Sequence, residues 1–211
     1  MNKAQDKITR APRVRAVFFD IGNVLLDYDV TKALKRFAWA VKSHPVRVAR
    51  LLWSRRILQD VERGVMSGRE LYALCRNDLE YAGSYEDFKK LFCGPFKLNR
   101  KSAGILKRCA ARVPTYLLSN TNQLHYEFIR DNYAFPADVK DAVLSYKLKL
   151  RKPERAIYDA ALKMAKVKAQ EAFFVDDLKP NVVAARRAGW RSVRFRGAHK
   201  LEKELVKLGV L

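Results

Sequence analysis

Short apolar runs alternate with amphipathic segments along most of the chain. The runs are rich in β-branched and aromatic residues, which is typical of strands buried on both faces. They lie at residues 14–20, 114–120, 172–177 and 192–197, with a weaker run at 141–147. Apolar positions with helical spacing occupy 122–132, 154–165 and 181–188. This alternation predicts an α/β fold, a Rossmann-like doubly wound parallel sheet with helices on both faces.

One long segment breaks the alternation. Over residues 31–98 the apolar positions follow helical spacing, as at Leu34, Phe37 and Val41. We therefore expect a helical insertion over the carboxyl ends of the strands, where ligands bind in such sheets. The predicted organisation is a basic tail over 1–13, an α/β core over 14–30 and 99–211, and a helical cap over 31–98.

Three of the predicted strands end in polar side chains. Asp20 follows the first strand, Ser119 and Asn120 end the second, and Asp176 and Asp177 end the third. Each cluster alone could be an ordinary turn or helix cap. Adjacent carboxylates repel each other unless a cation or hydrogen bonds compensate them, and Mg²⁺ binds carboxylates in proteins. The sequence therefore predicts a magnesium site at this edge of the sheet.

Four motifs that follow or flank these strands occur in a characteristic order. They are FFDIGNVL (18–25), LLSNTN (117–122), RKPERAIY (151–158) and FFVDDLKPNV (173–182). In these motifs the sequence resembles the haloacid dehalogenase (HAD) superfamily, and in particular its D-x-G-N-V subgroup. That subgroup includes bacterial glucose-1-phosphate phosphatase and the phosphatase domain of soluble epoxide hydrolase. The resemblance implies a HAD-like fold with a cap, and extends from about Val14 to Phe195.

The resemblance also implies a nucleophile and a metal site. Asp20 would be the nucleophile, since a carboxylate is ionised at neutral pH and needs no base. Asp20, the carbonyl of Gly22 and Asp177 would bind Mg²⁺. Asp176 and Asn181 would support this site or act as alternative ligands.

A phosphoryl site is implied by the two middle motifs. Ser119, Asn120 and Lys152 would bind the phosphoryl group, and the ammonium of Lys152 would stabilise the charge that develops on it. In the insertion, Glu62 and Arg63 belong to an E-R-G element that resembles one in the caps of the subgroup. They are our candidates for substrate contacts from the cap.

These features together predict a magnesium-dependent phosphatase. It would hydrolyse a small phosphorylated metabolite, for example a sugar phosphate, through an aspartyl-phosphate on Asp20. Most phosphatases of the superfamily carry a general acid two residues after the nucleophile, where this chain has Gly22, and nothing assigns that role to Asp27 or Asp29. General acid catalysis contributes about 10²- to 10⁴-fold in rate. We therefore expect a preference for acidic leaving groups, such as those of anomeric, acyl or aryl phosphates.

Two other functions remain open at this stage. In a hydrolytic 2-haloacid dehalogenase of the same superfamily, the same Asp attacks carbon without a metal, but the Asp176-Asp177 pair would then lack compensation. The second alternative is a catalytically weak, basic HAD-fold protein that binds RNA or another polyanion. It is suggested by 43 Lys and Arg residues against 22 Asp and Glu, a formal net charge of +21. Such binding would be non-specific and sensitive to salt.

The remaining features indicate no further chemistry. The odd number of cysteines and the absence of a CxxC pair argue against disulfides and a zinc site. No apolar run is long enough for a membrane span and the first residues lack the pattern of a secretory signal, so we expect a cytoplasmic protein.

The histidines show no metal-ligand spacing and are expected to be surface or packing residues: His44, His125 and His199. Aromatic residues of the insertion are expected to pack in a core rather than line a pocket, among them Trp39, Trp53 and Tyr72. The oligomeric state and the identity of the substrate stay open.

Overall fold

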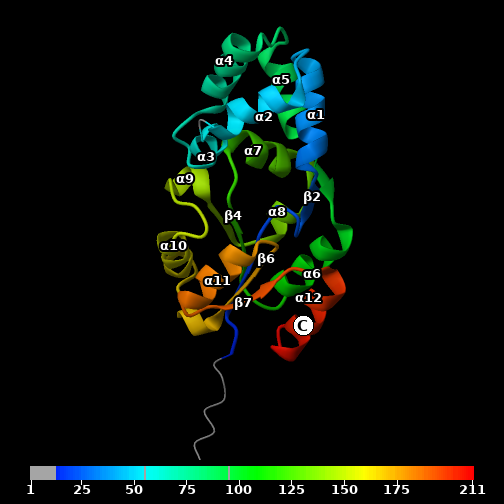
Figure 1. Cartoon of the computed structure of the whole chain (residues 1–211). Coiled ribbons are helices and arrows are strands. Elements are labelled where there is room, and N and C mark those ends of the chain that lie inside the picture. Colours follow the sequence, from blue (N-terminus) through cyan, green and yellow to red (C-terminus); the bar gives the residue numbers. More distant parts are fainter. Residues whose placement is uncertain (1–12, 55, 95) are drawn as a thin grey trace, which may run out of the picture.

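A five-stranded parallel sheet forms the centre of the molecule (Figure 1). The computed structural model describes residues 13–54, 56–94 and 96–211. The strand order is β5-β4-β1-β6-β7, and every neighbouring pair is parallel. The strands are β1 (Ala16–Phe19), β4 (Thr115–Ser119), β5 (Asp141–Leu144), β6 (Ala172–Asp176) and β7 (Arg191–Arg194). The predicted α/β fold is confirmed.

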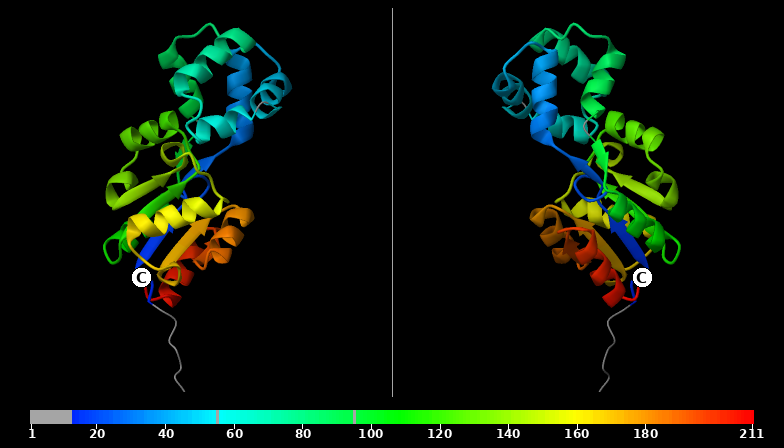
Figure 2. Two further views of the ribbon diagram at one scale, coloured as in Figure 1. Left: turned by 90° about the vertical axis from the view of Figure 1, so that its left-hand side faces the viewer. Right: turned by 90° about the vertical axis from the view of Figure 1, so that its right-hand side faces the viewer.

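Helices lie on both faces of this sheet (Figure 2). Between the helices and the sheet are two hydrophobic layers, one on each face. Val17 and Phe19 of β1 point into one layer, and Ala16 and Phe18 point into the other, so the whole strand is buried. This two-sided burial explains why the strands read as continuous apolar runs. The first layer is closed by α6 (Arg100–Ala110), α7 (Gln123–Asn132), α8 (Phe135–Asp138) and α12 (Ala198–Lys207). The second is closed by α10 (Arg155–Ala165) and α11 (Lys179–Arg187), with α9 (Ser145–Leu148) and the short 3₁₀ turn Ala169–Glu171 nearby in sequence.

The helical insertion is confirmed, and it has a hydrophobic core of its own. Phe37, Leu71, Phe88 and other buried side chains of the insertion pack together there, and Leu124 of α7 joins them from the core. In Figure 1 these helices form the upper part of the molecule, beyond the carboxyl ends of the strands. They are α1 (Val30–Ala40), α2 (Pro45–Ser54), α3 (Ile57–Glu62), α4 (Gly68–Leu79) and α5 (Tyr85–Cys93).

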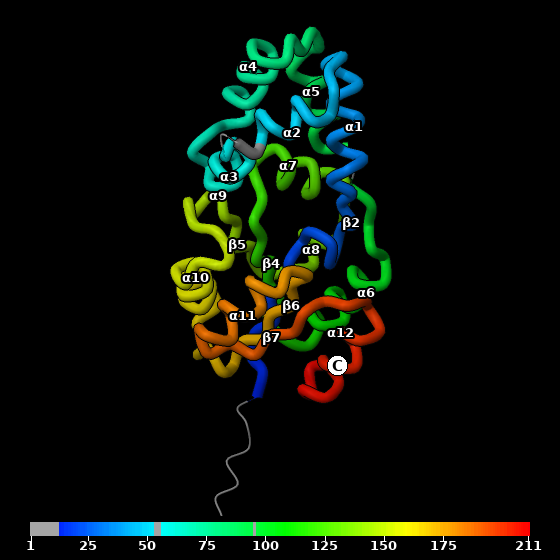
Figure 3. The backbone as a smooth tube through the Cα atoms, viewed as in Figure 1, coloured from blue at the N-terminus to red at the C-terminus, as the bar shows by residue number. Residues whose placement is uncertain are grey.

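A two-stranded antiparallel ribbon connects the insertion with the sheet (Figure 3). It pairs β2 (Leu26–Tyr28) with β3 (Phe96–Leu98), in the register Leu26 to Leu98 and Tyr28 to Phe96. The chain therefore enters and leaves the insertion along two adjacent strands. The sequence pattern did not predict this ribbon.

Other predictions for the insertion and termini have mixed outcomes. Core packing is wrong for Trp39, which is 84% exposed. Tyr72 does pack among apolar side chains, and its hydroxyl donates to the Gly83 carbonyl at 2.9 Å. The side chain of Trp53 and the basic tail up to residue 12 lie outside the described residues. The three cysteines are free thiols, and all three are buried. In the part of the chain that the structure describes, no helix is long and apolar enough to cross a membrane.

Candidate active site at the carboxyl edge of the sheet

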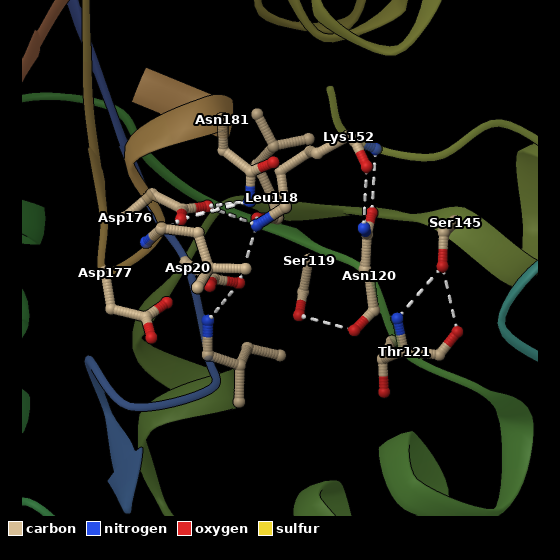
Figure 4. A network of polar contacts seen from close by, with 12 residues as sticks. Asp20, Leu118, Ser119, Asn120, Thr121, Ser145, Lys152, Asp176, Asp177 and Asn181 are labelled. Atoms are coloured by element: carbon tan, nitrogen blue, oxygen red, sulfur yellow. Dashed lines mark hydrogen bonds and ion pairs between the residues drawn. The ribbon is translucent and has the colours of Figure 1, made fainter. Parts of the chain in front are cut away.

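The polar residues predicted to meet at the strand ends do come together (Figure 4). Asp20 follows β1, Ser119 ends β4, and Asp176 ends β6 with Asp177 directly after it. These three strands are neighbours in the sheet, and all run parallel. The proximity therefore follows from the topology that the sequence predicted.

Lys152 lies at the centre of the group, on the loop that leads into α10. Its Nζ is 2.8 Å from Oδ1 of Asp20 and 2.7 Å from Oδ2 of Asp176, and it donates to the carbonyl of Leu118 at 2.9 Å. The three donors of the ammonium are thus all used. Burial opposes the charge on this side chain, but the two carboxylates outweigh it and raise the pKa of Lys152. It is a fixed cation within the protein.

Asp176 has a full set of protein partners. Besides Lys152, its carboxylate accepts from the backbone N–H of Leu178 at 2.8 Å and from Nδ2 of Asn181 at 3.0 Å. Asn181 is itself buried at the start of α11. Asp176 therefore orients the ammonium, and its oxygens have little capacity left for another ligand.

Asp20 and Asp177 are less well compensated. Oδ1 of Asp20 accepts from the backbone N–H of Ile21 at 2.8 Å as well as pairing with Lys152, and the side chain is buried. Burial raises the pKa of Asp20 despite the opposing effect of Lys152, and the charge of Asp176 adds to the rise. Burial likewise raises the pKa of Asp177, against a hydrogen bond of 3.2 Å from Nδ2 of Asn23. One ammonium thus faces three carboxylates.

This arrangement suits a divalent cation. Ligand oxygens of Asp20, Asp176 and Asp177 lie within 4.8 Å of one another. Since the oxygens of Asp176 are engaged in hydrogen bonds, Asp20 and Asp177 are the carboxylates of this cluster with oxygens left for a cation. Together with Gly22, these two residues line a cavity at this edge of the sheet. Hard oxygen ligands of this kind are those that Mg²⁺ selects. The residues present therefore fit the group that the sequence predicted.

Asn120 fixes the loop that carries Lys152. Its Oδ1 accepts from the backbone N–H of Lys152 at 2.8 Å, and its Nδ2 donates to the carbonyl of the same residue at 2.9 Å. Ser119 is buried next to it, and its hydroxyl has only a long contact of 3.5 Å with the Asn120 carbonyl. The side chain of Asn120 is thus engaged in positioning the loop, whereas the hydroxyl of Ser119 retains capacity for a ligand.

The E-R-G element of the insertion binds the core through crossed ion pairs. Arg151 donates to Oε2 of Glu62 at 2.6 and 2.8 Å, and Arg63 pairs with Glu154 and donates to the carbonyl of Lys149 at 3.1 Å. Glu62 also lines the cavity, while Arg63 is turned toward α10 and is not among the described lining residues. Both candidates for substrate contact therefore hold the insertion against the core in this structure.

Two further contacts draw this element close to the core. The hydroxyl of Ser145 is 2.6 Å from the carbonyl of Glu62, and it accepts from the backbone N–H of Thr121 at 2.9 Å. Gly64 adopts φ +65°, and a Cβ there would lie 2.3 Å from the carbonyl of Tyr146. Only glycine permits this approach. This close contact explains why the third residue of the E-R-G element is glycine.

Sequence reasoning missed two residues beside the carboxylates. Asn23 donates to Asp177 and accepts from the backbone N–H of Tyr28 at 3.2 Å, which links the carboxylate cluster to the ribbon. Arg194 of β7 donates to the carbonyl of Asp177 at 2.8 Å. Asn23 is part of the D-x-G-N-V motif, so its position could have indicated a contact with the carboxylate cluster. Arg194 belongs to none of the motifs, so nothing in the sequence around it indicated its contact with Asp177.

A cavity of about 430 Å³ lies between the carboxylate cluster and the insertion. The cluster residues Asp20, Lys152 and Asp177 form one end of its wall. Helices α1, α2, α3 and α5 contribute the other end. The half-buried His125 also lines it; His125 contacts the carbonyl of Phe92 through Nε2 at 3.3 Å, and burial lowers its pKa to about 4. The predicted packing role of this histidine agrees with these contacts.

Comparisons with known proteins show the family of the chain. A model described as haloacid dehalogenase-like hydrolase matches residues 14–189. The chain is 25% identical over 203 residues to a D-ribitol-5-phosphate phosphatase of Bacteroides thetaiotaomicron, covering 91% of this chain and 97% of the relative. It is 24% identical over 183 residues to the sesquiterpene phosphatase astK of Aspergillus oryzae, covering 83% and 86%.

Solved structures show the same fold. A crystal structure of a HAD family enzyme from Bacteroides thetaiotaomicron has a TM-score of 0.81 at 21% identity, covering 90% of this chain and 99% of that one. A complex of the wild-type enzyme with magnesium and inorganic phosphate has a TM-score of 0.74 at 22% identity, covering 86% and 93%. A 2-haloacid dehalogenase from Pseudomonas syringae has a TM-score of 0.66 at 18% identity, covering 92% and 99%. Because the family model spans most of the sequence, the chain belongs to the haloacid dehalogenase-like hydrolases.

Proposed function

We propose that this hydrolase is a magnesium-dependent phosphatase that acts on a small phosphorylated metabolite through an aspartyl-phosphate on Asp20. The observation that carries the proposal is the placement of Asp20 beside Lys152 and Asp177 at the wall of one cavity. Two curated relatives are phosphatases, and a related enzyme has been crystallised with magnesium and phosphate. The D-x-G-N-V run at residues 20–24 supports placing the chain in the subgroup of that motif.

The first step would be attack of Asp20 on phosphorus. Oδ1 of Asp20 is held by Ile21 and Lys152, which leaves Oδ2 to form the new oxygen–phosphorus bond. The bond between phosphorus and the ester oxygen breaks, and the alkoxide takes its electron pair. Lys152 and the hydroxyl of Ser119 would stabilise the oxygens of the transferring group. Mg²⁺ held by Asp20, Asp177 and the Gly22 carbonyl would offset the remaining charge. A water would then cleave the aspartyl-phosphate and regenerate Asp20.

Position 22 supports the expected preference for acidic leaving groups. Gly22 lines the cavity, and a Cβ built there would meet nothing within 4 Å, so the site has room but no carboxyl group to protonate the leaving oxygen. An ester whose alcohol is already acidic needs that proton least. Aryl phosphates should therefore be hydrolysed faster than alkyl phosphates of similar size.

Hydrolysis of p-nitrophenyl phosphate tests the proposal. We expect turnover that requires Mg²⁺, stops with chelator, and falls at least about 10³-fold in Asp20→Asn, because the amide is a poor nucleophile. Asp27→Asn is the matched control, since Asp27 is an exposed carboxylate on β2. Activity that survives both chelation and Asp20→Asn would rule out the proposed mechanism.

The dehalogenase alternative is less well supported. The solved dehalogenase shares the fold, but a metal-free site would leave Asp177 and Asp20 with one shared ammonium to compensate them. Chloride release from a 2-haloacid in the presence of chelator, without phosphatase activity, would favour this alternative over the phosphatase.

A basic groove supports the polyanion alternative as an additional activity. The groove measures about 550 Å³ between α11, β7 and α12, and Glu204 is the one acidic residue among its described lining residues. Its basic lining residues are Lys179, Arg186, Arg194, Arg196, Lys200, Lys203 and Lys207. A single-stranded RNA oligonucleotide should bind more weakly as salt rises, and more weakly to Lys200→Glu/Lys203→Glu than to the control Lys101→Glu/Lys107→Glu on α6. Equal binding by the two double variants would exclude the groove as the site.

A further inference from the structure

We infer that the preferred substrate is a phosphate monoester of a hydrophobic alcohol rather than of a polyol. The inference rests on the proposed phosphatase function, and it names the part of the substrate that lies beneath the insertion. The two ends of the cavity differ in chemistry. Asp20, Lys152 and Asp177 lie at the sheet end, whereas Glu62 is the one charged residue that the insertion contributes to the described lining, and it is paired with Arg151 of the core. The phosphate and the organic group of the substrate would therefore occupy different ends.

The wall formed by the insertion is apolar. Leu34 of α1, Leu52 of α2, Leu58 of α3, and Leu91 and Phe92 of α5 all line it. Each of these side chains is only half-buried, so each keeps apolar surface that a ligand could cover. Four helices separated in sequence thus present the same kind of side chain to one space. Covering that surface with an apolar group is favourable in proportion to the area removed from water.

Three polar side chains near this wall each have a protein partner. Glu62 is paired with Arg151 at 2.6 Å, and His125 contacts the carbonyl of Phe92 through Nε2. Oδ1 of Asn122 accepts from the backbone N–H of His125 at 3.0 Å, which caps α7. Oε2 of Glu62, Nε2 of His125 and Oδ1 of Asn122 are therefore already engaged within the protein.

A polyol would bind poorly to such a wall. Each hydroxyl that leaves water without finding a new partner loses its hydrogen bonds, and that loss opposes binding. An alkyl, cyclic or aromatic group has no hydroxyl to satisfy. The volume of about 430 Å³ lies within the range of roughly 300–1,000 Å³ that is typical of small-molecule pockets.

A matched pair of esters tests the inference. Pentyl phosphate and D-ribitol 5-phosphate have the same number of carbons and a primary phosphate, and differ in their hydroxyl groups. We expect kcat/KM for pentyl phosphate to be at least about ten-fold higher, and to rise roughly four-fold for each added methylene from pentyl to nonyl phosphate. The wild-type series alone suffices, so the test does not depend on any variant folding.

Variants locate the effect in the insertion. Leu34→Asn and Leu91→Asn should each lower the ratio of kcat/KM for nonyl phosphate to that for D-ribitol 5-phosphate about ten-fold. Val206→Asn is the control, because Val206 is an exposed apolar residue of α12 outside the cavity lining. A ratio unchanged in both leucine variants would overturn the assignment of this wall.

Two outcomes distinguish the inference from the function on which it rests. If p-nitrophenyl phosphate is hydrolysed with Mg²⁺ but D-ribitol 5-phosphate is preferred to pentyl phosphate, the inference is wrong and the phosphatase stands. If no phosphate ester is hydrolysed, including p-nitrophenyl phosphate, the proposed function fails and takes the inference with it.

Discussion

Replacing Lys152 by methionine tests the electrostatics of the site most directly. The change removes the ammonium but keeps a side chain of similar length, so the loss of charge dominates. Nζ lies 2.8 Å from Asp20 and 2.7 Å from Asp176, and both ion pairs are buried. With an effective dielectric constant of about 20, each pair is attractive by roughly 6 kcal/mol before the cost of desolvation.

Desolvation offsets much of that attraction, and the net loss is smaller. Removing one partner of a buried ion pair costs about 3–5 kcal/mol, because the remaining charge stays buried without compensation. We therefore expect Lys152→Met to lower the free energy of unfolding by about 3–5 kcal/mol. The change also raises the pKa of Asp20 further, since Lys152 opposes the effect of burial there. Phosphatase activity should be lost with it.

Urea denaturation in the presence of chelator measures the effect without a compensating cation. In a double-mutant cycle, Asp176→Asn removes one of the uncompensated charges, so Lys152→Met/Asp176→Asn should cost about 2 kcal/mol less than the sum of the single changes. Mg²⁺ should restore part of the stability of Lys152→Met. A loss below about 1 kcal/mol for Lys152→Met, or additive single effects, would refute this account of the site.

Three other predictions follow from the same structure. Gly22→Asp should keep the Mg²⁺ requirement and raise kcat on alkyl phosphates about ten-fold, since a Cβ meets no atom there; loss of bound Mg²⁺ in a binding titration would contradict this. Arg63→Glu should lower kcat/KM about five-fold by placing like charges beside Glu154, and Arg63→Glu/Glu154→Arg should restore it; a double variant no better than the single one would be the opposing result. Burial holds the pKa of His125 at about 4 in the folded chain against an ordinary 6.5, so only the unfolded chain gains this proton between those values. The contribution of His125 to the free energy of unfolding is thus greatest above pH 6.5, and it falls by about 1–2 kcal/mol from pH 7 to pH 5. In urea denaturation, His125→Gln should lose less free energy of unfolding over this interval than the wild type. Equal losses would show that another group is responsible.

The sheet and the carboxylate cluster were predictable because their signals are local. Two core strands are apolar runs that lead directly into a carboxylate, Asp20 and Asp176. One short stretch of sequence therefore predicts both the strand and the position of the carboxylate at its end. Parallel topology then brings the strand ends to one edge. No knowledge of distant contacts was needed to expect Lys152 and Asp20 at the same site once the motifs had been recognised.

The contacts between the insertion and the core were not predictable in this way. Each strand of the ribbon is only three residues long, and Leu26 pairs with Leu98 across the whole insertion. The crossed ion pairs join Glu62 to Arg151, again far apart in sequence. The prediction that Trp39 packs in a core was wrong, because the pattern of an amphipathic helix does not tell which single position will be left exposed.

The ribbon of β2 and β3 makes the insertion separable in principle. Because Leu26 and Leu98 are cross-strand partners, the chain enters and leaves the insertion at adjacent positions. The insertion contains none of the five strands of the sheet. A different helical module with equally close ends could be grafted onto the same ribbon without breaking a sheet pairing. Exchange of this one module would therefore change the wall that faces the substrate, while Asp20 and the chemistry proposed for it remain encoded elsewhere in the chain.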